Sequence, residues 1–257
     1  MDQAVPSRTL AEGVYAQLRM DILHGRLRPG DRLRIEKLRD TYRVGATPLR
    51  EALSRLSSFG LVIAEGQRGF RVAAVSVEDL LDVTRTRAWI ETLALRLAIA
   101  NGDRDWEADI LAAAHRLGGH SPTPADGHGL DADWDRANRA FHTALVSACR
   151  SAHLMAFREL LYDLSDRYRR LSLRDGLVGR DLAAEHAGIM DAVMNRDADR
   201  AVGLVLDHFL ETTRITLASD PATSANAPAM MARLREDILT GSGSPLLAAL
   251  PSARDRP

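Results

Sequence analysis

Apolar residues in the first 75 positions are spaced as in short helices and then as in strands. Val14, Leu18 and Ile22 share one helical face, and Pro48 suits the first position of a helix with Thr47 as its N-cap. The predicted elements are helices over 9–25 and about 35–42, a helix that begins near Thr47, and strands over 61–64 and 70–74. This order predicts a winged helix-turn-helix.

After residue 75 the pattern is helical throughout, and no strand pattern interrupts it. Helices are predicted over about 77–100, 103–118, 130–149, 151–172, 180–195 and 197–218. The expected fold class is therefore mainly α, with a winged helix-turn-helix over 1–75 and an all-α antiparallel bundle over 76–218.

The remaining residues, 219–257, are rich in Ala, Pro, Ser and Gly, and we expect most of this extension to be mobile. It contains a repeat: residues 232–241 match residues 16–25 at seven of ten positions. The repeat is either the remnant of a duplicated DNA-binding domain or a second, similar amphipathic helix, and the sequence leaves both open.

Composition and charge narrow the class of protein. The chain is 46% hydrophobic and 27% charged, as in ordinary globular proteins. It has no apolar run of the ~18 residues that a membrane helix needs, and its one cysteine, Cys149, suits a reducing compartment, so a cytoplasmic protein is expected. Residues 1–75 hold 13 basic and 8 acidic residues, against 21 and 27 in the rest. This asymmetry favours a nucleic-acid-binding module joined to a non-binding body.

The helix that begins near Thr47 is the predicted recognition helix. Thr47, Arg50 and Ser54 lie opposite its leucines, where they would face the major groove. Arg68 and Arg71 in the hairpin are placed to reach the phosphate backbone or the minor groove. Any one of these arginines could instead belong to an ordinary solvated face.

The run YAQLRMDILHGRLRPGDRLRIEKLRDTYRVGATPLREALSRLSSFGLVIAEGQRGFRV resembles the winged helix-turn-helix of the GntR family, especially the FadR-like branch with a helical FCD effector domain. Gly69 completes the G-x-x-G wing of that pattern. The family usually reads V-S-R-T-P where this chain has Val44-Gly45-Ala46-Thr47-Pro48. Ala46 cannot supply a guanine contact, so the resemblance implies either a different operator or compensation by Arg43 or Lys37.

Three histidines fall on inward faces of separate predicted helices: His142, His186 and His208. Asn138 lies one helical turn before His142, so the two side chains can point to the same place. Periodicity alone leaves two interpretations open, a shared site and three separate core histidines.

The resemblance implies a metal site. Metal-binding FCD domains present D/N-x-x-x-H on one helix and one histidine on each of two later helices, and Asn138, His142, His186 and His208 match that order. A divalent ion would be held by three imidazoles and one oxygen; Zn is expected, and Ni, Mn and Fe are compatible. The family pattern R-x-x-x-E recurs as Arg87 and Glu91. Arg87, with Asn138, could bind the carboxylate of a small organic acid, or Arg87 and Glu91 could form a surface pair.

Two other functions compete with a ligand-responsive regulator. A metal hydrolase needs a general base beside the metal, but Glu185 points about 100° away from His186 on a helix, so no enzyme is expected. An architectural DNA-binding protein would have an entirely apolar bundle core. We therefore expect a homodimeric regulator, most simply a repressor, that binds double-stranded operator DNA and responds to a small carboxylate.

Overall fold

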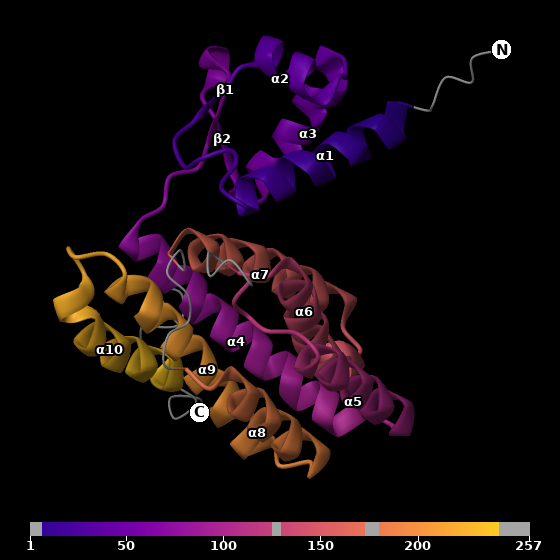
Figure 1. The fold of residues 1–257 in the computed structure, drawn as a ribbon, viewed down its shortest axis with the longest axis vertical. Coiled ribbons are helices and arrows are strands. Elements are labelled where there is room, and N and C mark those ends of the chain that lie inside the picture. Colours follow the sequence, from indigo (N-terminus) through magenta and orange to yellow (C-terminus); the bar gives the residue numbers. More distant parts are fainter. Residues whose placement is uncertain (1–6, 125–129, 173–179, 242–257) are drawn as a thin grey trace, which may run out of the picture. The chain divides into compact units, whose positions relative to one another are not determined.

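A computed structural model describes residues 7–124, 130–172 and 180–241 (Figure 1). The chain divides into two compact units. The first comprises the residues up to Ser76 together with 163–171, and the second comprises the remainder. This division differs from the predicted domains in two respects: residues 163–171 group with the first unit rather than with the helical bundle, and the described part of the extension after residue 218 groups with the second unit.

The first unit is a three-helix winged domain. Its elements are α1 (Ser7–Leu23), β1 (Arg32–Leu33), α2 (Ile35–Tyr42), α3 (Ala46–Ser58), β2 (Val62–Ala64), a 3-10 turn η1 (Gly66–Arg68) and β3 (Phe70–Val72). The antiparallel sheet has the order β1-β3-β2, with Leu33 opposite Phe70 and Val62 opposite Val72. Sequence analysis missed β1, because two residues are too few to show an alternating pattern.

The core of this unit forms where α1 packs against α3. Leu18 and Ile22 of α1 meet Leu49, Leu53 and Leu56 of α3, and all five are almost completely buried. These are the apolar positions that helical spacing selects, so the hydrophobic effect holds the recognition helix at a fixed place in the unit.

Two local details depend on backbone geometry. Helix α3 begins at Ala46 with Gly45 as its N-cap, so the prediction that Thr47 is the N-cap was wrong. Gly45 has the extended backbone that an N-cap requires, and a glycine cap costs little relative to a side-chain cap. In the wing, Gly69 has φ of 93°, a conformation that favours glycine over residues with a Cβ.

The second unit is a helical bundle. Its elements are α4 (Val77–Asn101), α5 (Arg104–Gly118), α6 (Ala132–Val146), η2 (Ser147–Cys149), α7 (Ala152–Ser172, as far as Tyr162), α8 (Leu182–Met194), α9 (Ala198–Ala218), η4 (Ser224–Asn226) and α10 (Ala227–Thr240). Helix α4 lies beside α9, α5 packs on α6, and α8 packs on α9 (Figure 1). The mainly α fold is as predicted, and the first six helices agree with their predicted ranges to within a few residues.

Aspartate caps fix where several of these helices begin. The side chains of Asp103, Asp131, Asp181 and Asp197 each accept a hydrogen bond from a backbone N–H in the first turn of α5, α6, α8 and α9. These contacts satisfy donors that have no partner inside the helix. The caps of α6 and α8 matter most here, because those helices carry His142 and His186.

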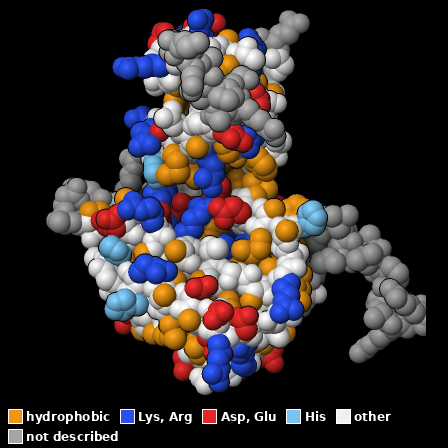
Figure 2. Space-filling view, turned by 90° about the vertical axis from the view of Figure 1, so that its right-hand side faces the viewer, with side chains coloured by type: hydrophobic (Ala, Val, Ile, Leu, Met, Phe, Trp, Pro, Cys, Tyr) orange, Lys and Arg blue, Asp and Glu red, His pale blue; other side chains and the backbone are white. Residues whose placement is uncertain are grey.

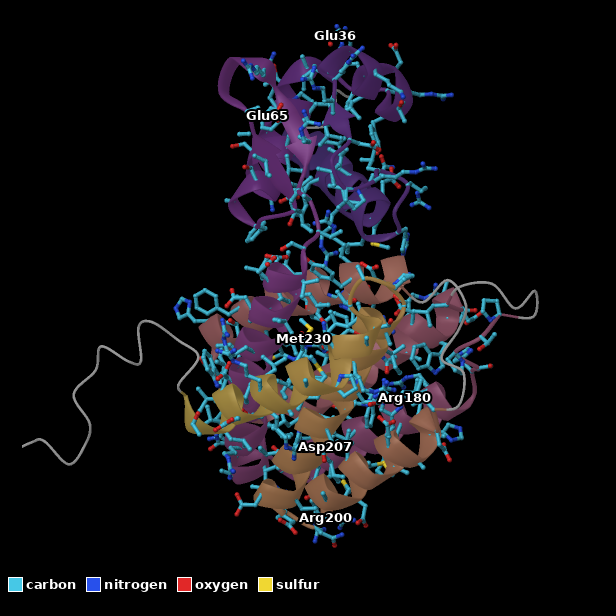
Figure 3. All side chains as sticks on the ribbon, turned by 90° about the vertical axis from the view of Figure 1, so that its left-hand side faces the viewer. Glu36, Glu65, Arg180, Arg200, Asp207 and Met230 are labelled. Atoms are coloured by element: carbon cyan, nitrogen blue, oxygen red, sulfur yellow. The ribbon has the colours of Figure 1, made fainter. Side chains whose placement is uncertain are left out.

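The extension differs from its expected mobility over residues 227–240, which form α10. Met231, Leu234 and Ile238 are buried on one face of α10, which packs against α9 and α4 (Figure 3). The indole Nε1 of Trp89 donates to the carbonyl of Ile238 at 3.1 Å. The prediction of mobility rested on the amino-acid composition of the whole extension. The structure of residues 227–240 depends instead on three apolar side chains with helical spacing, which form one buried face.

None of the described helices combines the length and apolarity needed to span a lipid bilayer.

Candidate metal centre and nucleic-acid interface

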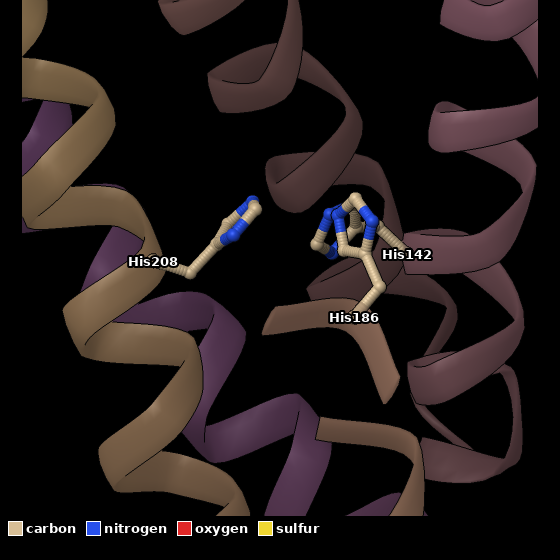
Figure 4. A group of neighbouring side chains, drawn as sticks. All are labelled: His142, His186 and His208. Atoms are coloured by element: carbon tan, nitrogen blue, oxygen red, sulfur yellow. The ribbon is translucent and has the colours of Figure 1, made fainter. Parts of the chain in front are cut away.

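The three predicted histidines converge inside the bundle from three helices. His142 comes from α6, His186 from α8 and His208 from α9 (Figure 4). Their ring centroids lie 5.0–5.3 Å apart, and one ligating nitrogen of each lies within 4.8 Å of the others. All three side chains are buried, so this is a shared interior cluster rather than three separate core residues.

Two of the three histidines, His142 and His208, are held neutral, which is the form that binds a metal. Burial, together with the neighbouring His208 and His186, keeps the pKa of His142 well below its ordinary value. Burial also lowers the pKa of His208 to about 4, against the opposing effect of its hydrogen bond with Glu185. Neutral imidazoles at physiological pH have lone pairs available for a divalent ion.

Two polar atoms beside the cluster support a ligand there. Among the described residues, Asn138 Oδ1 and His142 Nδ1 are buried without a hydrogen-bond partner. The Asn138 amide is oriented by its Nδ2, which donates to Tyr162 Oη at 3.4 Å. Buried polar atoms without partners are costly, and a bound ion would satisfy them. The donor set of three imidazoles and one amide oxygen therefore fits a divalent metal.

Arg87 lies near the cluster and is partly buried. Its guanidinium stacks on the rings of Phe209 and Tyr162, at 4.0 and 4.8 Å from the ring centroids. Its positive charge contributes to the lowered pKa of His142. Arg87 therefore supplies positive charge close to the histidines, as an anion-binding residue must.

Glu91 does not form the surface pair with Arg87 that was the predicted alternative. Glu91 is 1% exposed, and its Oε1 accepts from Arg158 Nε of α7 at 3.0 Å. Arg158 is itself fully buried and also donates to Thr143 Oγ1, while its Nη2 has no hydrogen-bond partner among the described residues. Sequence analysis missed Arg158, because a lone arginine in an amphipathic helix is normally on the surface.

A pocket of about 370 Å³ opens beside the cluster. It is lined by apolar side chains of α5, α6 and α8, including Leu117, Trp134, Phe141 and Met190, and by His186 and Arg180. Arg87 is not part of this lining, so the pocket approaches the cluster from the His186 side. Its volume lies in the range of small-molecule sites.

Glu185 has a contact that helical geometry on one element could not reveal. It does not face His186, as the helical angle predicted, but its Oε2 lies 2.7 Å from His208 Nδ1 on α9. Burial would raise the pKa of Glu185, yet hydrogen bonds from His208 and Arg180 lower it to about 2. Glu185 is therefore ionised and oriented by its partners.

In the winged domain, most of the predicted DNA-contacting side chains are exposed. These are Lys37, Arg43, Thr47, Arg50, Ser54 and Arg68. Thr47, Arg50 and Ser54 project from the side of α3 opposite its buried leucines. Figure 2 shows basic side chains projecting from this domain, whereas the displayed face of the helical domain mixes acidic, basic and hydrophobic groups.

A groove of about 390 Å³ joins the recognition helix to the wing. It is lined by four arginines from three segments: Arg32 and Arg34 at β1, Arg50 on α3 and Arg68 in the wing. Gly69 also lines it, with a single acidic residue, Glu36. Arg32 and Arg34 were not predicted, because only the folding of β1 against β3 brings them beside Arg50. The charge of this groove suits a phosphate backbone.

Arg71 makes hydrogen bonds inside the winged domain. Its Nε donates to Glu65 Oε1 at 2.8 Å, and its Nη1 donates to the carbonyl of Gly30 at 2.6 Å. These contacts tie the base of the wing to the turn before β1. Arg71 thus supports the wing rather than projecting from it as Arg68 does.

Comparison with known proteins decides the family. The model of the bacterial regulatory proteins of the gntR family matches residues 10–72, and the FCD domain model matches residues 82–211. The HTH-type transcriptional regulator BphR of Paraburkholderia xenovorans is 41% identical over 79% of this chain and 83% of its own length. The chain belongs to the GntR family of transcriptional regulators, with an FCD domain.

Other GntR-family proteins agree with this. The HTH-type transcriptional repressor GlaR of Escherichia coli is 41% identical over 76% of this chain and 90% of its own. The solved structure of E. coli McbR/YncC shares the fold, with a TM-score of 0.66 at 22% identity over 80% of this chain and 96% of that one. GntR-family members are DNA-binding regulators, so the prediction that this chain is not an enzyme is confirmed.

Proposed function

We propose that this GntR regulator is a repressor that binds operator DNA as a homodimer and responds to a small carboxylate at a metal-containing cavity in its FCD domain. The repressor role is taken from the similarity to GlaR, a transcriptional repressor. A homodimer is proposed because one small winged domain contacts too few base pairs for specific binding.

The observation that carries the cavity proposal is the buried cluster of three histidines beside the partly buried guanidinium of Arg87. His142, His186 and His208, with Asn138 Oδ1, would hold a divalent ion, and Zn is the ion we expect, with Ni, Mn or Fe compatible. Arg87 and Arg158 both lie close enough to His142 to lower its pKa. Because Glu91 compensates the charge of Arg158, a metal together with the guanidinium of Arg87 would favour an anionic effector over a neutral one.

On the DNA side, we propose that Arg50 contacts base edges and that the arginine groove follows the backbone. Arg50 belongs both to α3 and to the groove, which makes it the residue best placed for both tasks. Thr47, Ser54 and Arg68 are exposed beside it, while Lys37 and Arg43 are the exposed cations that could replace the serine and arginine missing from the family motif.

Elemental analysis of protein purified without chelator tests the metal site. About one divalent ion per chain is expected in the wild type and none in His142→Ala/His208→Ala. The matched control is His115→Ala/His153→Ala, which removes two exposed histidines and should keep the metal. A wild type without metal, or a cluster mutant that retains it, would contradict the proposal.

The effector is tested by thermal shift of the metal-loaded protein with hydroxy acids, sugar acids and amino acids. A stabilising acid should lose its effect in Arg87→Ala and should change the affinity for a DNA fragment selected with the wild-type protein. An architectural protein without effector would show no response to metal or to any acid.

A further inference from the structure

One of the three cluster histidines is anchored by a carboxylate from a different helix. Glu185 on α8 places Oε2 2.7 Å from His208 Nδ1 on α9. An imidazole engaged at Nδ1 has only Nε2 left for a metal. The contact therefore selects which nitrogen of His208 can take part in the cluster.

Arg180 holds Glu185 in this position. Its Nε donates to Glu185 Oε1 at 2.7 Å and its Nη2 to Oε2 at 2.6 Å, a two-point contact between guanidinium and carboxylate. Arg180 also donates from Nη1 to Thr212 Oγ1 at 2.7 Å and from Nη2 to the carbonyl of His208 at 2.9 Å. Figure 3 labels Arg180, whose side chain is only 5% exposed. The arginine thus ties the start of α8 to α9.

The distances in this network assign the proton of His208 to one ring nitrogen. Arg180 Nη2 lies 3.1 Å from the same Nδ1, but an ionised carboxylate can only accept, and it lies closer. Nδ1 therefore donates to Glu185, while Arg180 satisfies its donors on Glu185, Thr212 and the His208 carbonyl. With Nδ1 engaged by Glu185, the lone pair that can bind a metal is on Nε2.

We propose that Glu185 is a positioning residue for the metal centre, which fixes the tautomer and ring orientation of His208, and that Arg180 is the anchor of Glu185. This inference rests on the proposed metal site. Carboxylate–histidine–metal arrangements raise the basicity of the ligand and hold its ring, and losing the outer carboxylate typically weakens metal binding 10–100-fold. Glu185 would thus act through His208 without contacting the metal.

The test is the dissociation constant for Co²⁺, measured by competition with a chelator, together with the visible absorption spectrum of the Co²⁺-loaded protein. Glu185→Ala should bind Co²⁺ about 10–100-fold more weakly and with an altered spectrum. Glu185→Gln keeps an acceptor oxygen for Nδ1, so its loss should be smaller. Arg180→Lys, which cannot make the two-point contact, should fall between wild type and Glu185→Ala.

Glu211→Gln is the matched control. Glu211 is a carboxylate of α9 close to His208 in sequence, but it pairs with Arg214 and is 39% exposed. Its removal takes away a nearby negative charge without touching the ring, so affinity and spectrum should equal those of wild type. The free energy of unfolding of each metal-free variant shows whether it folds, and Glu185→Gln carries the test if Glu185→Ala does not.

Two results would overturn the proposal, and they are distinguishable. Wild-type affinity and spectrum in both Glu185 variants, with binding lost in His208→Ala, would remove Glu185 from the metal centre and leave the centre itself standing. A wild type that binds Co²⁺ no better than His208→Ala would refute the metal site and the positioning role together.

Discussion

Replacing Glu91 by Met should severely destabilise the FCD domain. The side chains of Arg158 and Glu91 are 0% and 2% exposed, and Nε lies 3.0 Å from Oε1. Methionine has nearly the volume of glutamate, so little cavity is created and the main effect is a buried guanidinium without its counter-charge. Removing one partner of a buried ion pair costs about 3–5 kcal/mol.

The magnitude separates this tertiary pair from a surface pair. If Glu91 only paired with Arg87 along an exposed helix face, its loss would cost about 0.3–0.5 kcal/mol. For a unit of this size, about 3–5 kcal/mol corresponds to a fall in the melting temperature of roughly 6–20 °C. The two arrangements therefore predict results that differ well beyond experimental error.

The assay is urea unfolding of the metal-free protein, followed for the transition of the helical domain. The double variant Glu91→Met/Arg158→Met should recover much of the loss, because apolar replacement of both partners of a buried pair is often near neutral. Asp133→Asn, which breaks the exposed pair with Arg136, is the control and should change the free energy of unfolding by less than about 0.5 kcal/mol. A loss below about 1 kcal/mol for Glu91→Met, or no recovery in the double variant, would refute the reasoning.

Four further predictions concern other parts of the molecule. The pKa of His208 is about 4 in the folded protein against an ordinary value of 6.5, so its contribution to stability is complete above pH about 6.5 and is lost as pH falls toward 4. In urea unfolding of the metal-free protein, the loss of stability over this pH range should be smaller in His208→Gln than in wild type by about 3 kcal/mol, because the histidine that remains neutral on burial, His142, still contributes in both. Leu53→Ala, at a fully buried position of α3, should cost about 2–5 kcal/mol in the winged domain, and near-wild-type unfolding there would contradict the α1–α3 core. Trp89→Phe removes the hydrogen bond to Ile238 and should cost about 0.5–1.5 kcal/mol and speed proteolysis within α10, whereas an unchanged cleavage pattern would argue against this anchor. Arg50→Ala should weaken specific DNA binding by about 1–3 kcal/mol in fluorescence anisotropy, and equal affinity would exclude Arg50 from the reading surface.

Helical periodicity predicted inward positions for the candidate ligands Asn138, His142, His186 and His208, and all four side chains are buried. Asn138 and His142 are four residues apart on one helix, and both side chains are buried. His186 and His208 lie among apolar residues on their own helices, so each had to face the interior. Inward-facing histidines on several helices of one bundle can lie close together or far apart. The resemblance to metal-binding FCD domains is what favoured a shared site.

Where the prediction failed, the deciding information was not on a single element. The N-cap of α3 is Gly45 rather than Thr47, because Gly45 is the last residue with an extended backbone before the helix begins. Such a difference of two residues at a helix end depends on backbone dihedral angles, which the order of residue types does not fix. Residues 227–240 looked disordered in composition, but α10 gains a buried face only because α4 and α9 offer a surface to cover.

The sequence by itself determined the winged domain, the succession of bundle helices and the inward direction of the three histidines, because the spacing of apolar residues fixes which face of each helix is buried. It could not determine that Glu91 meets Arg158, 67 residues away, or that Glu185 meets His208. Those pairings depend on the rotation and axial position of one helix against another. Tertiary packing sets both the rotation and the axial position. The apolar periodicity within one helix is compatible with many rotations and positions against its neighbour, so it does not select one of them.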